Sequence, residues 1–152
     1  MGGEPAPRVP ASRSLLLFQD HLVRGLWAQR HLEALANDPK SLEAFASIVE
    51  CTRELHKQQQ EAAAAQSPAK FKQAATRNKV CMCLSVCHDE TMEWLQCVRS
   101  QMKLHKGDKE AGLAGQRIHC EERRRQVESC TQYASTRLLY AAVMPQDRNE
   151  VF

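Results

Sequence analysis

Two pairs of cysteines with identical spacing constrain this chain of 152 residues more than any other feature. Nine residues separate Cys87 from Cys97, and nine separate Cys120 from Cys130. On an α-helix ten steps turn about 1000°, so the members of a pair lie on one side of the helix, about 80° apart around its axis and roughly 15 Å apart along it. If two such helices lie antiparallel, Cys87 lies opposite Cys130. Cys97 then lies opposite Cys120.

The composition favours helix along the whole chain. Two Trp, two Tyr and four Phe are the only aromatic residues. β-Branched residues are scarce, while Ala, Leu, Gln, Glu, Lys and Arg, which have high helix propensity, are abundant. The length suits one domain, or a small domain with a helical extension. The expected fold is all-α.

Prolines, glycines and turn residues divide the chain into four regions. Three prolines and two glycines near the start predict an extended arm. Pro68 and the two cysteine pairs delimit a hairpin of helices, and two further helices are expected before it. The regions are an N-terminal arm, an N-terminal helical pair, a helical hairpin and a polar tail, at residues 1–13, 14–67, 68–143 and 144–152.

Hydrophobic periodicity predicts four long helices, at about residues 14–36, 39–65, 68–106 and 116–143. Three glycines within residues 106–115 predict a loop between the last two. The first helix has a wide apolar face, expected to pack on the second helix with part of it contacting another protein. The stripes expected to face the core of these two helices are Leu15, Phe18, Leu22 and Leu26, and Leu42, Phe45 and Val49.

The twin cysteine pairs, each within a helical pattern, resemble the twin Cx9C, or CHCH, proteins of the mitochondrial intermembrane space. The resemblance covers roughly a third of the chain, from Cys87 to Cys130 with its helix flanks. It implies an antiparallel helical hairpin stapled by two disulfides, Cys87–Cys130 and Cys97–Cys120. It also implies import in the reduced form and oxidation by the disulfide relay of that compartment.

Members of this family are mostly accessory subunits or assembly factors of respiratory and related complexes, and they are not, as a rule, enzymes. The resemblance therefore implies a non-catalytic accessory or structural subunit on the intermembrane-space side of an inner-membrane complex. A respiratory complex is the first choice and the ATP synthase the second. The implied partners are subunits of that complex and, during import, the relay oxidoreductase.

Two other functions remain open within the same family. One is a soluble assembly factor or copper chaperone of the intermembrane space. The other is a CHCH protein of the mitochondrial ribosome, in which the basic stretch Lys70–Lys79 would touch RNA. The net charge of +3 is small and dispersed, so a nucleic-acid partner is not expected.

The hydropathy pattern predicts no membrane-spanning helix, so the resemblance implies a protein that is peripheral to the inner membrane. No apolar run approaches the roughly 20 residues needed to span a bilayer; the run from Leu15 to Phe18, for example, is followed at once by Gln19 and Asp20. Glu4 and the three prolines do not fit a transit peptide. Import through the disulfide relay requires no such presequence.

Aromatic and apolar residues near the cysteines suggest a docking face for import. Trp94 lies one turn from Cys97, and Tyr133 lies one turn beyond Cys130. The resemblance implies that such residues dock the precursor on the relay oxidoreductase, and Trp94 with Leu95 and Tyr133 are the candidates. The simpler alternative is that the aromatic rings cover the disulfides.

The other three cysteines have several interpretations. Cys51 is expected to be a buried free thiol, and the alternative is a third bridge to Cys81 or Cys83. A zinc site is a further alternative. Its ligands would be Cys81, Cys83, Cys87 and His88, joined by His119 and Cys120 of the next helix. Because residues two apart on a helix point about 200° from each other, Cys81 and Cys83 do not suit one tetrahedral ion.

Redox and copper chemistry are weaker interpretations of the same thiols. Met82 stands between Cys81 and Cys83, where the relay oxidoreductase has proline, and nothing in the sequence lowers a thiol pKa there. The pair is neither adjacent nor near a flexible tail, as copper delivery would favour. The histidines show no metal-site spacing and are expected at the surface. No phosphate loop or nucleophile motif occurs, so neither an enzyme nor a bound cofactor is expected.

Overall fold

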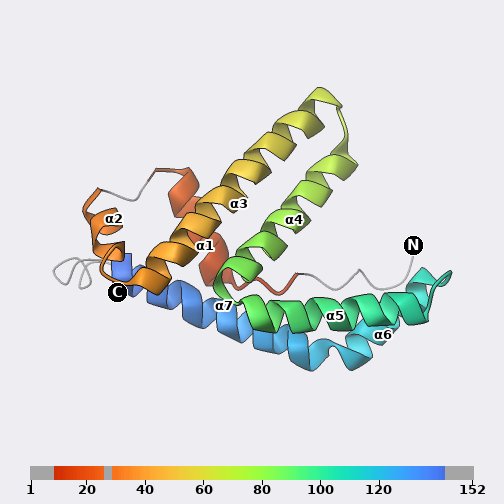
Figure 1. Cartoon of the computed structure of the whole chain (residues 1–152). Helices are drawn as coiled ribbons and strands as arrows, with labels where there is room; N and C mark the ends of the chain where they lie inside the picture. Colours follow the sequence, from red (N-terminus) through yellow and green to blue (C-terminus); the bar gives the residue numbers. More distant parts are fainter. Residues whose placement is uncertain (1–8, 26–28, 143–152) are drawn as a thin grey trace.

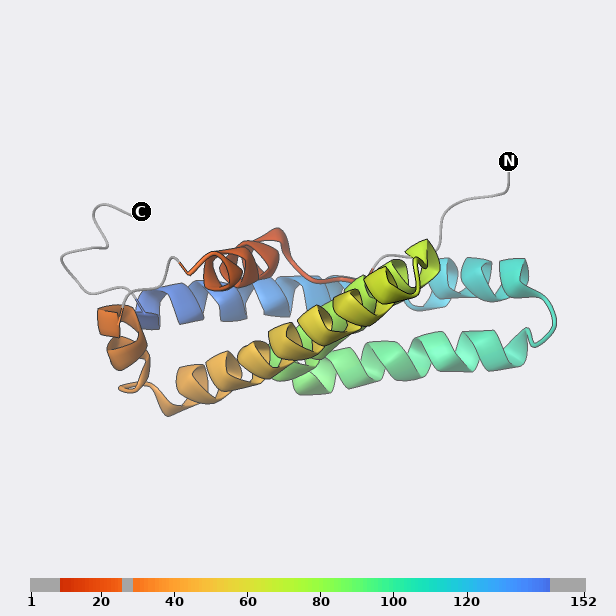
Figure 2. The same cartoon turned by 90° about the horizontal axis from the view of Figure 1, so that it is seen from above.

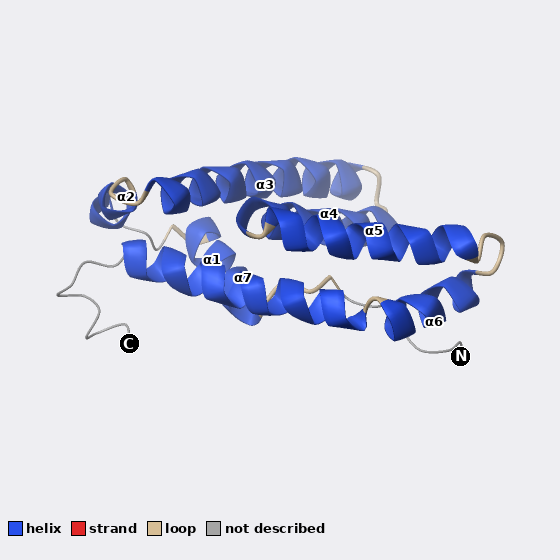
Figure 3. Ribbon diagram, turned by 60° about the horizontal axis from the view of Figure 1, so that its bottom comes forward, coloured by secondary structure: helices blue, strands red, loops and turns tan. Residues whose placement is uncertain are grey.

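The structure is a computed structural model that describes residues 9–25 and 29–142. These residues form seven helices and no strand (Figure 3), which confirms the all-α expectation. The predicted tail, Leu26 and most of the predicted arm lie outside the described residues. The helices are α1 (Arg13–Val23), α2 (Gln29–Leu35), α3 (Pro39–Ala64), α4 (Pro68–Val86), α5 (His88–Leu104), α6 (Lys109–His119) and α7 (Glu121–Ala142).

Two antiparallel hairpins dominate the molecule. One is formed by α3 and α4, which turn back at Gln66, a residue with φ of +50° (Figure 1). The other has α5 as its first arm, and α6 followed by the start of α7 as its second arm, which runs back along α5 (Figure 1, Figure 3). The sequence suggested a boundary at residue 67, between the N-terminal helical pair and the helical hairpin. α3 lies before this boundary and α4 after it, so their pairing crosses it. None of the seven helices is both long and apolar enough to traverse a bilayer.

Capping residues explain where the two hairpins begin their return helices. The Ser67 hydroxyl accepts a hydrogen bond from the Lys70 amide of α4 at 3.2 Å. The Asp108 carboxylate likewise accepts one from the Ala111 amide of α6 at 3.1 Å. Side chains of this kind satisfy amide groups that a helix start leaves without partners. Pro68 follows at the first helical position, where a missing N–H costs little.

The first predicted helix is wrong, because two shorter helices replace it. α1 ends at Val23, and Gly25 follows with φ of +69°. The Gly25 amide donates to the Leu22 carbonyl at 3.1 Å. A glycine in the left-handed region just after a helix is a common stop, because other residues pay a steric cost there. The chain therefore turns before α2.

Cysteines interrupt both long helices predicted for residues 68–106 and 116–143. Cys87 separates α4 from α5 with φ of −141° and ψ of 61°, and Cys120 separates α6 from α7. Asp89 with Glu90 opens the helix after the first break, and two glutamates open the helix after the second. Acidic residues in a first turn interact favourably with the helix dipole. The break at Cys87 lets α4 leave the line of α5 and pair with α3.

The turn between α5 and α6 is shorter than the loop predicted for residues 106–115. α6 begins at Lys109, so Gly112 and Gly115 lie inside a helix and are buried. A Cβ atom at Gly112 would lie 2.8 Å from Met102 Sδ, and one at Gly115 would clash with the Gln101 side chain. These glycines therefore allow α5 and α6 to approach closely.

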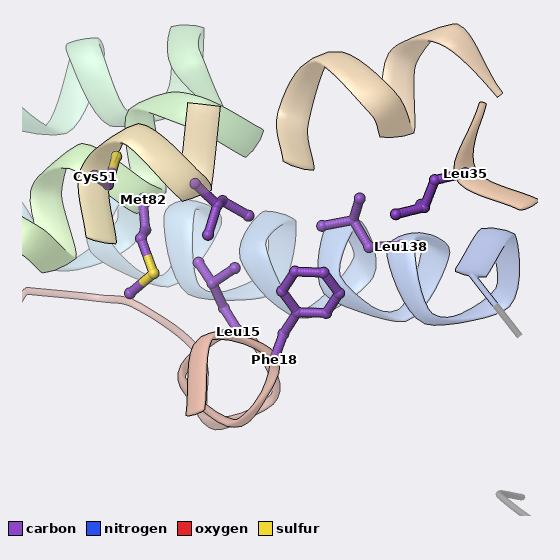
Figure 4. Close-up of a cluster of buried hydrophobic side chains, with 7 residues drawn as sticks. Leu15, Phe18, Leu35, Cys51, Met82 and Leu138 are labelled. Atoms are coloured by element: carbon purple, nitrogen blue, oxygen red, sulfur yellow. The ribbon is translucent and has the colours of Figure 1, made fainter. Parts of the chain in front are cut away.

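Two clusters of buried side chains form the core. The larger lies where α1, α2, α3, α4 and α7 meet (Figure 4), and the smaller lies between the end of α4, α5 and α7. Their fully or nearly fully buried members are Leu15, Phe18, Leu35, Ile48, Cys51, Met82 and Leu138 in the larger cluster, and Cys83, Trp94, Cys120 and Val127 in the smaller.

The face that α1 buries differs from the expectation. α1 and α2 pack mainly on α7 (Figure 2), and α1 makes a smaller contact with α3 through an edge-to-face pair of Phe18 and Phe45, with ring centroids 6.1 Å apart. In α3 the predicted stripe is partly wrong, because Leu42 is exposed and Ile48 is buried instead. Just before α1, the Ser12 amide donates to Thr131 Oγ1 of α7 at 2.9 Å.

Candidate functional site

The equally spaced cysteines form two disulfides across the second hairpin. Cys97 of α5 is bonded to Cys120 at the start of α7, with their Cα atoms 5.8 Å apart. Cys87, where α4 meets α5, is bonded to Cys130 in α7, with Cα atoms 6.1 Å apart. This is the pairing that the resemblance implies. The two bonds are successive rungs, because α5 and α7 run antiparallel (Figure 3).

The inner rung, Cys97–Cys120, belongs to the smaller buried cluster. Cys120 is 2% exposed and packs with Trp94 and Val127. Trp94 is only 6% exposed, and Leu95 is half-buried beside the same cluster. In the oxidised protein these two candidate docking residues therefore cover a disulfide instead of presenting a surface.

The outer rung, Cys87–Cys130, borders an open groove on the protein surface. Cys130 and Tyr133 line this groove of about 180 Å³ together with residues of α3. Tyr133 is 73% exposed, in contrast to Trp94. The three candidate docking residues therefore do not form one exposed face in the oxidised protein.

An ion pair stands at the edge of this groove and ties α7 to the start of α3. Arg137 pairs with Asp38 at 3.2 Å, and the Ser41 hydroxyl donates to the same carboxylate at 2.8 Å. The hydrogen bond from Ser41, followed by that from Arg137, lowers the pKa of Asp38. Asp38 therefore stays ionised at the junction of the two hairpins.

A third disulfide joins Cys51 of α3 to Cys81 of α4, with Cα atoms 5.8 Å apart. The prediction that Cys51 is a free thiol is therefore wrong, and the alternative of a third bridge is the one found. Cys51 is 2% exposed and belongs to the larger core cluster. The bridge fastens the first hairpin to itself, so each hairpin carries at least one disulfide.

All seven cysteines lie in the described residues, and Cys83 alone has no disulfide partner. Its side chain is fully buried next to Trp94 and Cys120. Burial raises the pKa of the Cys83 thiol to about 12. Since the thiolate is the nucleophile and the metal ligand, Cys83 is not poised for either role in the folded protein.

The residues weighed as alternative zinc ligands are not brought together. Cys81 and Cys87 belong to different disulfides, and the exposed His88 lies beside Asp89. Within residues 9–25 and 29–142 the group with metal-ligand spacing is Cys87, Glu90 and Cys130, whose ligand atoms lie within 4.8 Å of one another. Two of these atoms are the sulfurs of the outer rung, and a disulfide sulfur lacks the charge of the thiolate that zinc prefers.

A cluster of charges opens α7 next to the inner rung. Arg124 pairs with Glu121 at 2.8 Å, and Arg125 pairs with the same carboxylate at 3.2 Å. The hydrogen bond from Arg124, with the charges of Arg124 and Arg125, lowers the pKa of Glu121 to about 2. Arg123 reaches across the hairpin to Glu93 of α5 at 3.0 Å. This stretch therefore supplies ion pairs as well as a solvated face.

The third disulfide had a signal in the sequence. Cys51 lies thirteen residues before the end of α3 at Ala64, and Cys81 lies thirteen residues after the start of α4 at Pro68. Two residues at equal distances from the turn of an antiparallel hairpin lie side by side, because both helices rise 1.5 Å per residue. The spacing about Ser67-Pro68 thus indicates the Cys51–Cys81 pair once these helices are taken as partners.

Comparisons with known proteins do not add to this picture: no family model, no curated protein and no solved structure matches the chain.

Proposed function

We propose that this chain is a non-catalytic accessory subunit on the intermembrane-space side of a mitochondrial inner-membrane complex, with a respiratory complex as first choice and the ATP synthase as second. The observation that carries the proposal is the pair of disulfide rungs formed by two equally spaced cysteine pairs on antiparallel helices. Three disulfides in one small chain fit an oxidising compartment, because the cytosol keeps thiols reduced. The twin spacing supports the intermembrane space in particular, because it resembles that of the twin Cx9C proteins of this compartment.

The chemistry of the sulfur atoms supports a structural role. Six of the seven are held in disulfides, and burial raises the pKa of the remaining thiol, Cys83, to about 12. Sulfur in these states is neither a nucleophile nor a thiolate ligand at neutral pH. A copper chaperone is correspondingly less favoured, because the Cys81 thiol it would use is bonded to Cys51.

The import step of the proposal assigns a temporary role to Trp94. In the reduced chain the inner rung has not closed, and Trp94 with Leu95 is available to dock on the relay oxidoreductase. Oxidation then buries Trp94 against Cys120 and Val127. The same residue thereby serves import first and the folded core afterwards.

Fractionation and native electrophoresis test the proposal. Mitochondria from cells that make the endogenous protein are treated with protease before and after selective rupture of the outer membrane, and solubilised inner membranes are then separated on a native gel. We expect protection in intact mitochondria, digestion after rupture, and co-migration with one intact inner-membrane complex. A matrix marker and a known intermembrane-space marker serve as controls.

Each other outcome contradicts part of the proposal. Protection after rupture of the outer membrane would place the chain in the matrix and favour the mitochondrial ribosome. Migration as a free small protein would favour a soluble assembly factor. Recovery of the protein in the cytosol with reduced thiols would exclude the intermembrane space as its compartment.

A further inference from the structure

The net positive charge of the chain is not dispersed, as the composition suggested, because the excess of basic over acidic residues arises in one segment. Between Ala62 and His88 there are four Lys or Arg residues and no Asp or Glu. The whole chain has 21 Lys and Arg against 18 Asp and Glu, so acidic residues outnumber basic ones by one outside this segment. The segment forms the tip of the α3–α4 hairpin and all of α4. Its charge is therefore a property of this hairpin and not of the molecule as a whole.

These basic side chains are exposed and unneutralised. Lys70, Lys72 and Arg77 are exposed, and Lys79 is half-buried. Among the described residues none of the four takes part in an ion pair, in contrast to the arginines that open α7. The C-terminus of α3 carries a partial negative charge and the N-terminus of α4 a partial positive charge. Because the two meet at the tip and cancel, the helix dipoles do not offset the charge of the lysines. Glu61, in the last turn of α3, is the nearest acidic residue, and five basic residues between residues 55 and 80 outnumber it. The outer part of the hairpin is thus a net cationic surface.

The tip stands apart from the rest of the protein. Figure 1 shows the α3–α4 hairpin rising away from α5, α6 and α7. α1 accompanies it only part of the way, since the pocket between α1 and the hairpin extends as far as Gln59 and Ala75. In the segment between those two residues, only Ala62 and Ala74 are buried. The described residues therefore leave this end of the hairpin uncovered.

An aromatic ring lies in the middle of the cationic tip. Phe71 is 41% exposed and is flanked in sequence by Lys70 and Lys72. At 100° per residue, these three side chains spread around about 200° of the first turns of α4. The exposed residues next to them at the turn are small and uncharged, and include Ala63 to Ala65 and Ala69. The tip is convex, apolar at its centre and basic around it.

From these observations we infer that the tip of the α3–α4 hairpin, centred on Lys70, Phe71 and Lys72, docks end-on onto a membrane surface that carries anionic lipids. Lysines bind the phosphates of anionic headgroups and extend their apolar stems along the interface. An aromatic side chain between them enters the boundary between headgroups and acyl chains. The inference deepens the proposed function, on which it rests for the identity of the membrane.

End-on contact distinguishes a membrane from a nucleic acid or an acidic helix. Lys72 lies about 6 Å along α4 from Pro68, whereas Lys79 lies about 16 Å away, beyond a Debye length of about 8 Å. A bilayer touched by the tip therefore senses Lys70 and Lys72 much more strongly than Arg77 and Lys79. A strand of RNA or an acidic helix lying along α4 would engage all four.

The other hairpin provides a matched control. Its tip also exposes a large apolar residue next to lysines, since Leu104 is 71% exposed and follows Lys103. At the turn itself Asp108 and Glu110 stand among the lysines, which are Lys103, Lys106 and Lys109. The two tips thus resemble each other in size, apolar exposure and lysine content, but only the second has acidic residues interspersed with its lysines.

Vesicle flotation with the purified, oxidised full chain tests the inference. The vesicles contain phosphatidylcholine alone or with about 30% phosphatidylglycerol, a lipid content sufficient for a negative surface potential. We expect binding only to the anionic vesicles, weakened when salt rises from about 0.15 M to about 0.5 M. K70Q/K72Q is expected to lower the partition coefficient roughly 25-fold, at about fivefold per lysine. F71A is expected to lower it roughly tenfold, through lost apolar burial.

Control variants decide between the modes of binding. K103Q/K106Q and L104A at the other tip, and R77Q/K79Q along α4, are expected to change the partition coefficient less than about twofold, since these residues lie outside the contact. Thermal unfolding of every variant checks that each is folded, and all substituted residues are exposed or half-buried.

Four results overturn the inference. They are no preference for anionic vesicles, equal losses from substitutions at both tips, a loss with R77Q/K79Q as large as with K70Q/K72Q, and tighter Lys70- and Lys72-dependent binding to an RNA oligonucleotide than to the vesicles. The assay needs no complex, so a failure here leaves the fractionation result standing. Conversely, vesicle binding by a protein found in the matrix would refute the proposed function alone.

Discussion

The two hairpins of this protein share a plan and differ in how they are held together. The α5–α6–α7 hairpin has two disulfide rungs and buries Trp94 and Val127 between them. The α3–α4 hairpin has one disulfide, Cys51–Cys81, thirteen residues from its turn, and beyond α1 its seam buries only alanines. In the α5–α6–α7 hairpin the disulfides reinforce a buried interior, whereas in the α3–α4 hairpin the disulfide fastens two helices whose outer half has little interior to bury.

The difference follows from the physics of small domains. A short pair of helices buries too little apolar surface to offset its loss of conformational entropy, so additional constraints are needed. Disulfides supply them by restricting the unfolded chain. The unequal placement of the bridges predicts that the outer half of α3 and α4 opens at lower free energy than the second hairpin.

The largest expected effect comes from removing both rungs together, by replacing Cys87, Cys97, Cys120 and Cys130 with Ser. In the chain-entropy model the inner ring of 24 residues, closed across a separation of 23, contributes about 3.4 kcal/mol, and the outer ring adds a smaller amount. That sum is comparable with the whole stability of a small domain. Urea unfolding followed by circular dichroism and Trp fluorescence measures the loss.

A matched control for that experiment is Cys83→Ala, which removes a thiol without removing a bridge. It is expected to cost about 1 kcal/mol for the lost buried volume. Equal unfolding midpoints for the four-serine variant and the wild type would show that the rungs are not what holds this hairpin.

The second effect is local to the other hairpin. Replacing Cys51 and Cys81 with Ser opens a ring of 31 residues, closed across a separation of 30, worth about 3.7 kcal/mol in the same model. Amide hydrogen exchange is expected to accelerate throughout α3 and α4 while α5 and α7 stay protected. Uniform acceleration over all four helices would show that the two hairpins unfold as one unit and are not held separately.

A smaller effect tests the alanine seam. Ala74 is 1% exposed, so Ala74→Leu forces α3 and α4 apart and is expected to cost about 1–3 kcal/mol. Its neighbour Ala75 is exposed, and Ala75→Leu is expected to change the free energy of unfolding by less than about 0.5 kcal/mol. Thermal melts of the two variants provide the measurement, and similar values for both would contradict a close-packed seam.

The smallest effect concerns the charge cluster of the second hairpin. Because Arg124 and Arg125 lower the pKa of Glu121 to about 2 from an ordinary value of 4.5, the stabilisation is complete above pH 4.5 and is lost as pH falls toward 2. Solvent screens this half-exposed carboxylate, so the contribution is under about 1 kcal/mol.

Comparing Glu121→Gln with wild type tests that pH dependence. The variant is expected to be slightly less stable at pH 7, and the difference is expected to shrink steadily below pH 4.5 and to disappear below pH 2. Glu122→Gln, at an exposed neighbouring position, is the control. A gap between Glu121→Gln and wild type that persists unchanged at pH 2 would show that ionisation of Glu121 is not its cause.

The sequence predicts the second hairpin better than the first because the second carries a periodic signal. Equal spacing of two cysteine pairs points to antiparallel helices, and Trp94 and Val127 are buried between them. The α3–α4 seam is built from alanines, which helical periodicity does not single out. Helical periodicity therefore gives no reason to pair Cys51 with another residue. The signal for the Cys51–Cys81 bridge is that both cysteines lie at the same distance from the turn.

The breaks in the helices are harder to derive from sequence. Gly25 stops α1, yet Gly112 and Gly115 lie within α6, so glycine alone does not decide between a helix end and a close contact. The outcome depends on the tertiary partner, since α5 lies against Gly112 and Gly115. Cys87 and Cys120 end helices without a glycine or proline, and the acidic residues that follow them are the available local signal.

The most direct test of the whole account is a disulfide map of the purified protein. Free thiols are blocked in denaturant without reduction, the chain is digested, and the linked peptides are identified by mass spectrometry. We predict linkages 51–81, 87–130 and 97–120, with Cys83 as the one blocked thiol. Alkylated Cys51 and Cys81, or a bridge that joins one hairpin to the other, would contradict two independently fastened hairpins.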